Sequence, residues 1–245
     1  MKLNVVLKSW SEVTEAIENL NSLGLPPHPD TVKSWDTWKI INFIYKNGKK
    51  ESNILDVGCN GSPVLPILRR LGFKNLYGCD VDLNIRKRRL LRRIKNRMSG
   101  EDPDKLLSEM LENNDKFYHL SIQDLEKTNY ESNTFQFVSS LSVIEHGVNI
   151  RNYFSEMSRI LKSGGFLLTS TDYWHEKIKT TSNVYNRSVG DVIFDRNEIE
   201  EAIDIAQNSG LELYEPIEFN YRDKVVKWKK TKQEYTFLFF GLRKK

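Results

Sequence analysis

The sequence has few cysteines and no long apolar run. Its only cysteines, Cys59 and Cys79, do not form a CxxC pair, so we expect neither a disulfide framework nor a zinc site. No segment approaches the roughly 20 apolar residues that a membrane-spanning helix needs. The start of the chain, MKLNVVLKSW, is too short and too polar for a secretion signal. These absences predict a soluble, cytoplasmic protein.

Neither sign of charge is in large excess, because the formal net charge is only +4 over 245 residues. So mild an excess argues against a nucleic-acid partner. Hydrophobic residues make up 39% of the chain, which is enough to bury the core of one large domain.

Short apolar runs alternate with helical patterns through the middle of the chain. The runs predict strands at 53–57, 75–80, 116–120, 135–141 and 165–170, with helices between them at 63–71, 83–98, 103–111 and 149–161. Strands that alternate with helices indicate a mostly parallel sheet with both faces covered.

The two ends of the chain depart from this alternation. Helical patterns at 11–23 and 34–47, the second with Ser34 as N-cap, predict a helical extension over residues 1–50. Asp195 and Glu198 form a capping box for a helix ending at 207, and the strands at 211–219 and 234–242 then form an antiparallel pair. The expected fold class is α/β, a Rossmann-like, doubly wound, mostly parallel seven-stranded sheet with an antiparallel last strand.

Glycine is scarce in the turn after the first strand of this sheet, ILDVGCNGSP at 54–63. A dinucleotide site needs the pattern GxGxxG there, and only Gly58 and Gly61 are present. The carboxylate of Asp56, at the mouth of the site, would repel a pyrophosphate but attract an ammonium or sulfonium group. Asp80 ends the next strand at the same edge, where it suits the hydroxyl groups of a ribose. A ribose with a cationic tail describes S-adenosylmethionine.

The stretch from 54 to 171 resembles a class I S-adenosylmethionine-dependent methyltransferase. The resemblance is to the broad, type 11-like group related to the ubiquinone-biosynthesis methyltransferases. The matching motifs, in order, are LDVGCNGS, YGCDVD, IQDLE, FQFVSSLSVIEH and RILKSGGFLLTS. This resemblance implies a methyltransferase domain over 51–245.

The resemblance also implies where the cofactor lies. It places Asp56 and the backbone of 58–60 near the methionine moiety and Asp80 on the ribose. It places Val81 against the adenine, and Asp124 with Leu125 at the adenine amine. The implied cofactor-binding residues are Asp56, Gly58, Cys59, Asn60, Asp80, Val81, Asp124, Leu125 and Ser140.

Some positions depart from the family pattern or have a structural alternative. Asn60 and Ser62 stand where the family commonly has glycines; we expect Asn60 to tolerate the left-handed backbone conformation that such a turn requires. Gln136 replaces a frequent aspartate. Asp56 and Asp80 could be ordinary turn acids, and Asp124 could be the N-cap of a short helical turn.

Methyl transfer asks a protein mainly to position the acceptor and remove its proton. His146, just past the fourth strand, is a candidate base, or alternatively a histidine that fixes its loop. The segment 170–195 exceeds the usual loop length, which favours an acceptor-site lid. Within it, His175 and Tyr173 are further catalytic candidates, although Tyr173 and Trp174 could instead be core aromatics.

These features predict O-methylation of a small molecule or a sugar or glycan. One alternative is a non-catalytic binding module that keeps the cofactor fold. Another is an RNA methyltransferase, which the absence of an N/D-P-P-Y-type motif opposes.

Positive charge is concentrated in RKRRLLRRIKNR at 86–97, which predicts a basic amphipathic helix. Either this is a solvated face balanced by the acidic stretch at 101–113, or it draws in an anionic acceptor.

Overall fold

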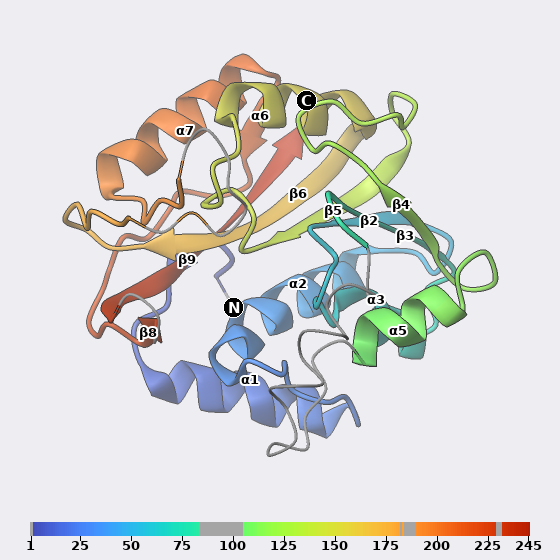
Figure 1. Cartoon of the computed structure of the whole chain (residues 1–245), viewed down its shortest axis with the longest axis horizontal. Helices are drawn as coiled ribbons and strands as arrows, with labels where there is room; N and C mark the ends of the chain where they lie inside the picture. Colours follow the sequence, from blue (N-terminus) through green and yellow to red (C-terminus); the bar gives the residue numbers. More distant parts are fainter. Residues whose placement is uncertain (1, 84–104, 182, 184–189, 229–231) are drawn as a thin grey trace.

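The computed structural model describes residues 2–83, 105–181, 183, 190–228 and 232–245. Within these ranges a central sheet is covered by helices on both faces (Figure 1). Five strands run parallel in the order β4-β3-β2-β5-β6. They are β2 (Asn53–Val57), β3 (Asn75–Asp80), β4 (His119–Ile122), β5 (Phe135–Leu141) and β6 (Leu161–Tyr173).

The end of the sheet beyond β6 is antiparallel. Strand β9 (Gln233–Lys244) pairs antiparallel with β6, with β7 (Leu211–Leu213) and with β8 (Val226–Trp228). The predicted fold class, including its antiparallel last strand, is confirmed. The extension predicted to be helical also contributes a strand, since β1 (Val5–Val6) pairs with β9, placing Val5 opposite Phe239.

Two apolar cores lie on opposite faces of the sheet. Helices α1 (Trp10–Ser22), α2 (Ser34–Asn47), α3 (Val64–Arg70) and α5 (Lys105–Glu112) cover one face, and α6 (Ile150–Ile160) and α7 (Arg196–Asn208) cover the other (Figure 1). Across the described part of the chain, no helix combines the length and apolar character that crossing a membrane requires.

Most predicted boundaries agree with the structure to within three residues. Ser34 is not the N-cap of α2, because the 3-10 turn η1 (Thr31–Lys33) runs directly into the helix and leaves Ser34 as its first residue. Asp195 and Glu198 do form the predicted capping box. The fifth parallel strand continues to Tyr173, so the first residues of the expected lid are strand residues. The helix predicted at 83–98 lies almost wholly outside the described residues.

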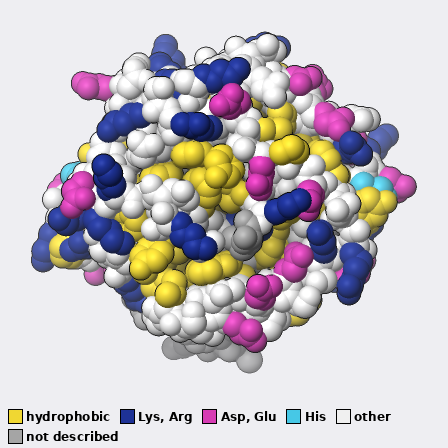
Figure 2. All heavy atoms as spheres, turned by 180° about the vertical axis from the view of Figure 1, so that it is seen from behind, with side chains coloured by type: hydrophobic (Ala, Val, Ile, Leu, Met, Phe, Trp, Pro, Cys, Tyr) yellow, Lys and Arg dark blue, Asp and Glu magenta, His cyan; other side chains and the backbone are white. Residues whose placement is uncertain are grey.

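Charged side chains of both signs are interspersed with apolar ones on the face seen in Figure 2. That face therefore carries no continuous surface of one sign, in agreement with the small net charge.

Candidate active site

The turn after β2 takes its shape from two glycines. Gly58 and Gly61 have φ values of 70° and 89°, and the backbone N–H groups of Gly58 and Cys59 both donate to the carbonyl of Cys79. Asn60 is not among the described residues with positive φ, so the expectation of a left-handed Asn60 is wrong. The absence of a glycine at this position therefore does not disturb the turn.

Asn60 instead joins the turn to the end of β3. Its backbone N–H donates to Oδ2 of Asp80 at 3.1 Å, and its side-chain amide donates to the carbonyl of Asp82 at 3.0 Å. Oδ1 of Asp80 accepts the backbone N–H of Asp82 at 3.2 Å. The two turns thus hold the Asp80 carboxylate in one position at the carboxyl edge of the sheet.

A narrow hollow of about 40 Å³ opens between these turns and the end of β5. It brings together five of the predicted site residues and adds three from the segment after β5. The lining residues are Gly58, Asp80, Val81, Leu125, Ser142, Val143, His146 and Val148. This volume holds only a small part of a ligand, so we expect a ligand to continue along Val81, which is 38% exposed.

Gly58 packs directly against Val143, another residue of the hollow. A Cβ on Gly58 would lie 2.6 Å from Cγ2 of Val143, and the φ of 70° already disfavours a side chain. We therefore expect Gly58→Ala to lower the free energy of unfolding by about 2–4 kcal/mol, through strain and overpacking. Gly61→Ala is the matched control, because its φ is 89° but no atom lies within 4 Å of its Cβ position. Equal losses in urea denaturation would contradict the role of the Val143 contact.

Asp56 lies beneath the turn and is fully buried. Its predicted place at the mouth of the site is therefore wrong. Oδ1 accepts the hydroxyl of Ser139 at 2.6 Å, whereas Oδ2 has no hydrogen-bond partner. Burial raises the pKa of Asp56 to about 7, although the nearby hydroxyls of Ser139 and Ser62 oppose the shift. An unsatisfied buried carboxyl oxygen next to the turn fits a ligand that donates a hydrogen bond.

Two serines at the end of β5 and just after it differ from the sequence prediction. Ser140 faces the hydroxyl of Tyr153 in helix α6, so its side chain does not line the hollow. Ser142, which was not predicted, lines it with a positive φ of 53° and a buried hydroxyl without a partner. A strained, non-glycine residue of this kind is typical of a functional site. Cys59 and Cys79 are fully buried and need no redox role.

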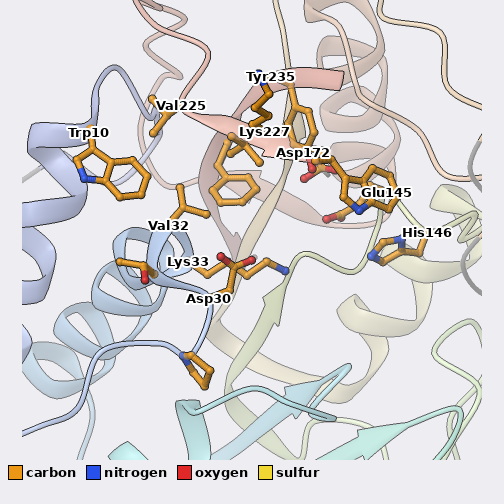
Figure 3. Close-up of a pocket in the computed structure, with 15 residues that line it drawn as sticks. Trp10, Asp30, Val32, Lys33, Glu145, His146, Asp172, Val225, Lys227 and Tyr235 are labelled. Carbon is orange, nitrogen blue, oxygen red and sulfur yellow. The ribbon is translucent and has the colours of Figure 1, made fainter. Parts of the chain in front are cut away.

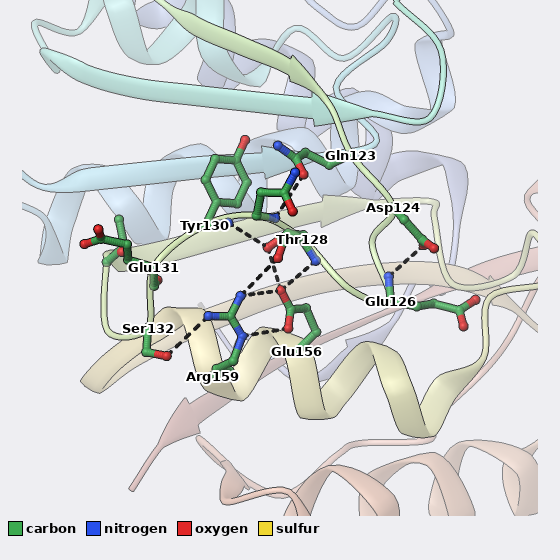
Figure 4. Close-up of polar contacts among 11 residues, drawn as sticks. Gln123, Asp124, Glu126, Thr128, Tyr130, Glu131, Ser132, Glu156 and Arg159 are labelled. Carbon is green, nitrogen blue, oxygen red and sulfur yellow. Dashed lines mark hydrogen bonds and ion pairs between the residues drawn. The ribbon is translucent and has the colours of Figure 1, made fainter.

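The loop after β4 supplies Leu125 to the hollow and holds Asp124 outside it. Oδ1 of Asp124 accepts the backbone N–H of Glu126 at 3.0 Å, so this exposed side chain caps a turn. Glu156 of helix α6 holds this loop. Its carboxylate accepts hydrogen bonds from the guanidinium of Arg159 and from both the backbone N–H and the hydroxyl of Thr128 (Figure 4). This network sets the position of Leu125.

Loss of the hydrogen bonds to Glu156 should lower the stability of the protein. We expect Glu156→Ala to lower the free energy of unfolding by about 2 kcal/mol, because two donors of Thr128 lose a charged, mostly buried acceptor. Glu200→Ala is the control, since the Glu200–Arg196 pair on α7 is exposed and an exposed ion pair contributes little to stability. Equal losses in chemical denaturation would show that the loop is held by other contacts.

His146 stands between the hollow and a much larger pocket. It lines both, and its Nδ1 lies 2.9 Å from Oδ1 of Asp191. A carboxylate at Nδ1 holds that nitrogen in its N–H form, which leaves the basic lone pair on Nε2. The sequence analysis did not predict a role for Asp191. Only its place within the expected lid at 170–195 could have indicated one.

The larger pocket has a volume of about 550 Å³. Side chains from the N-terminal extension, from the ends of β5 and β6, and from the β8–β9 hairpin converge on it (Figure 3). Its lining includes Trp10, Asp30, Val32, Lys33, Glu145, His146, Asp172, Val226, Lys227, Trp228, Tyr235 and Phe237. The extension therefore forms a wall of the site, which the sequence did not predict.

The pocket floor is acidic. Burial raises the pKa of Asp172 to about 7 and raises that of Glu145 well above its usual range, with Asp172 adding to the shift at Glu145. Burial also raises the pKa of Tyr235, whose hydroxyl interacts with Asp172. These groups are suited to binding hydrogen-bond donors.

The structure brings neither Tyr173 nor His175 to this pocket. Tyr173 is fully buried against Phe219, and burial raises its pKa to about 12. His175 stacks on Tyr221, with ring centroids 3.7 Å apart. Both predictions assumed a lid beginning at residue 170, whereas β6 continues through Tyr173, which makes Tyr173 a core strand residue, and the ring of His175 packs on Tyr221 just beyond the strand.

Comparison with known proteins agrees with this geometry. A family model described as a methyltransferase domain matches residues 35–215. Over 125 residues the chain is 32% identical to the mitochondrial ubiquinone biosynthesis O-methyltransferase of Dictyostelium discoideum. That match covers 49% of this chain and 35% of the relative, so the chain spans about a third of the relative's length.

Solved structures share the fold at low sequence identity. One is phosphoethanolamine N-methyltransferase 2 of Haemonchus contortus with S-adenosyl-L-methionine, at 16% identity and a TM-score of 0.56, covering 83% of this chain and 51% of that one. Another is the cyclase SpnF, at 13% identity and a TM-score of 0.56, covering 96% and 94% of the two chains. Two such different names on one fold show that the fold alone does not fix the reaction.

Proposed function

Because this chain belongs to the methyltransferase domain family, we propose that it transfers a methyl group to an oxygen of a small hydroxylated acceptor, such as a sugar. Membership confirms the predicted family. The family match and the printed name of the relative support the predicted enzyme class and the predicted cofactor, S-adenosylmethionine. The acceptor and the methylated atom are the proposal.

The residues around the hollow fit the cofactor. Gly58 lines the hollow in a left-handed conformation with Val143 packed where a Cβ would lie, and Asp80 presents a fixed carboxylate suited to ribose hydroxyls. Asp56 retains an unsatisfied oxygen beside the turn. When bound, S-adenosylmethionine supplies a methyl group on a positively charged sulfur. Val81 and Leu125 offer the apolar contacts suited to the adenine.

The single observation that carries the proposal is the position of His146, which lines both the hollow and the 550 Å³ pocket. An acceptor hydroxyl in the pocket could donate its proton to Nε2, while the Asp191 carboxylate stabilises the protonated ring through Nδ1. The pocket is large enough for a small molecule or one sugar unit. Residues 1–50 would serve as its outer wall, and residues 51–245 as the catalytic domain.

Methyl transfer can be tested directly. The purified protein would be incubated with methyl-labelled S-adenosylmethionine and panels of sugars, phenols and amines, and the products analysed by mass spectrometry and NMR. We propose that label appears on oxygen. Label on nitrogen, or on RNA offered in the same assay, would contradict the proposed acceptor.

The alternatives have less support. A non-catalytic module was suggested by Asn60, yet Asn60 connects the turn to Asp82 without strain. An RNA or anionic acceptor depends on the basic segment 86–97, which lies outside the described residues. A cytoplasmic location remains a prediction.

A further inference from the structure

Two buried carboxyl groups form the floor of the large pocket. Glu145, after β5, is 1% exposed, and Asp172, at the end of β6, is 8% exposed. Oε2 of Glu145 accepts the hydroxyl of Thr171 at 3.2 Å, whereas Oε1 is buried without a hydrogen-bond partner. A buried carboxyl oxygen that lacks a partner on a pocket floor calls for a donor from the occupant.

The charged groups around this floor do not balance it. Asp36 of α2 and Asp191 add negative charge near Asp172, and Lys33 faces both carboxyl groups from η1. Within the described ranges Lys33 makes no ion pair within 4 Å. The other lysine of the lining, Lys227, is already paired with Glu234. Acidic side chains therefore outnumber basic ones around the floor.

The walls above the floor are aromatic. Trp10, Trp228, Tyr235 and Phe237 come from α1, β8 and β9 and line the same pocket (Figure 3). Aromatic faces attract cations, most strongly where water is excluded. Acidic floor and aromatic walls together favour a positively charged group over a negative one.

We propose that the acceptor carries a protonated amine, which the pocket binds between Glu145 and Asp172 while another part of the acceptor lies at His146. This rests on the proposed function for the identity of the pocket as the acceptor site. A neutral hydroxyl could donate to Oε1 of Glu145, but it would bring no positive charge to offset the floor's excess of acidic groups. A carboxylate or phosphate would add to that excess.

Proton release on binding follows from the same arrangement. Burial raises the pKa of Asp172 to about 7 and raises that of Glu145 well above its usual range, so both groups give up their protons less readily in the empty pocket. An ammonium group beside these carboxyl groups lowers both pKa values. The floor then loses protons as the amine binds, and with a probe of fixed charge affinity rises with pH.

The test compares probes that share one ring and differ in charge. D-glucosamine, D-glucose and D-glucuronate would be titrated into the protein saturated with S-adenosylhomocysteine, by calorimetry at pH 6.5 in two buffers of different ionisation enthalpy. We expect glucosamine to bind at least about 10-fold more tightly than glucose, with proton release, and glucuronate to bind more weakly than glucose. Tetramethylammonium, whose charge does not titrate, gives the pH dependence.

Two variants test whether Glu145 and Lys33 determine the preference for the amine. Glu145→Gln should reduce glucosamine binding to the level of glucose, and Lys33→Met should strengthen it by removing the competing cation. Unchanged binding of S-adenosylhomocysteine would show that both variants are folded.

Equal binding of the three sugars, absence of binding by all of them, or retained amine preference in Glu145→Gln would overturn the inference. Methyl transfer is measured separately. Failure of the proposed function would therefore appear as absent methylation despite a preserved amine preference.

Discussion

Replacing His146 by alanine is expected to lower kcat at least about 100-fold and to leave the affinity for S-adenosylmethionine nearly unchanged. The reason is that His146 is the only basic side chain lining both the hollow and the large pocket in the described part of the chain. Loss of a general base typically costs 10²–10⁴-fold in rate. Steady-state kinetics and calorimetry on the same preparation measure the two quantities.

Two companion variants make this result specific. Asp191→Asn keeps a hydrogen-bond acceptor near Nδ1 but loses the charge, so kcat should fall less than in His146→Ala while KM for the acceptor changes little. His175→Ala is the control, because His175 stacks on Tyr221 and lines neither pocket. Full activity in His146→Ala would mean that positioning alone accounts for the reaction.

Asp80→Ala should weaken S-adenosylmethionine binding by roughly 2–4 kcal/mol, about 30- to 1000-fold. The carboxylate lies at the end of β3, is held by the N–H groups of Asn60 and Asp82, and lines the hollow. Its loss removes the acceptor for the ribose hydroxyls. Calorimetry gives the affinity, and circular dichroism checks that the fold persists.

Part of this loss could come from the turn that Asp80 holds, and two further variants separate the contributions. Asp80→Asn keeps one oxygen for a backbone N–H but removes the charge, so it should lie between wild type and Asp80→Ala. Asp124→Ala should bind normally, because Asp124 is exposed and caps its own turn. Unchanged affinity in a folded Asp80→Ala would refute the ribose assignment, and tight binding of NAD would refute the class.

The sequence was sufficient for the fold because its signals are local. The strand at 53–57, the strand at 75–80 and the capping box of Asp195 and Glu198 depend on apolar alternation and on spacing within four residues. β1 was missed because two residues carry no periodicity; its partner, Phe239, lies more than two hundred residues away.

The residues of the hollow were predicted better than those of the large pocket for the same reason. Gly58, Asp80 and Leu125 belong to short ordered motifs at strand ends, and they do line one hollow. The large pocket combines Lys33, Glu145 and Tyr235, which meet only after the sheet has formed. No local pattern marks such a combination. Tyr173 was misplaced because the length of β6 depends on its pairing with β9, and His175 because it stacks on Tyr221, a partner distant in sequence.

The account depends most on the hollow between Gly58, Asp80 and Leu125 being the cofactor site. A crystal structure of the protein with S-adenosylhomocysteine tests this directly. We predict density with the ribose hydroxyls at the Asp80 carboxylate and the sulfur directed toward His146 and the large pocket. Density elsewhere on the molecule, or a ligand whose sulfur faces away from His146, would contradict the account.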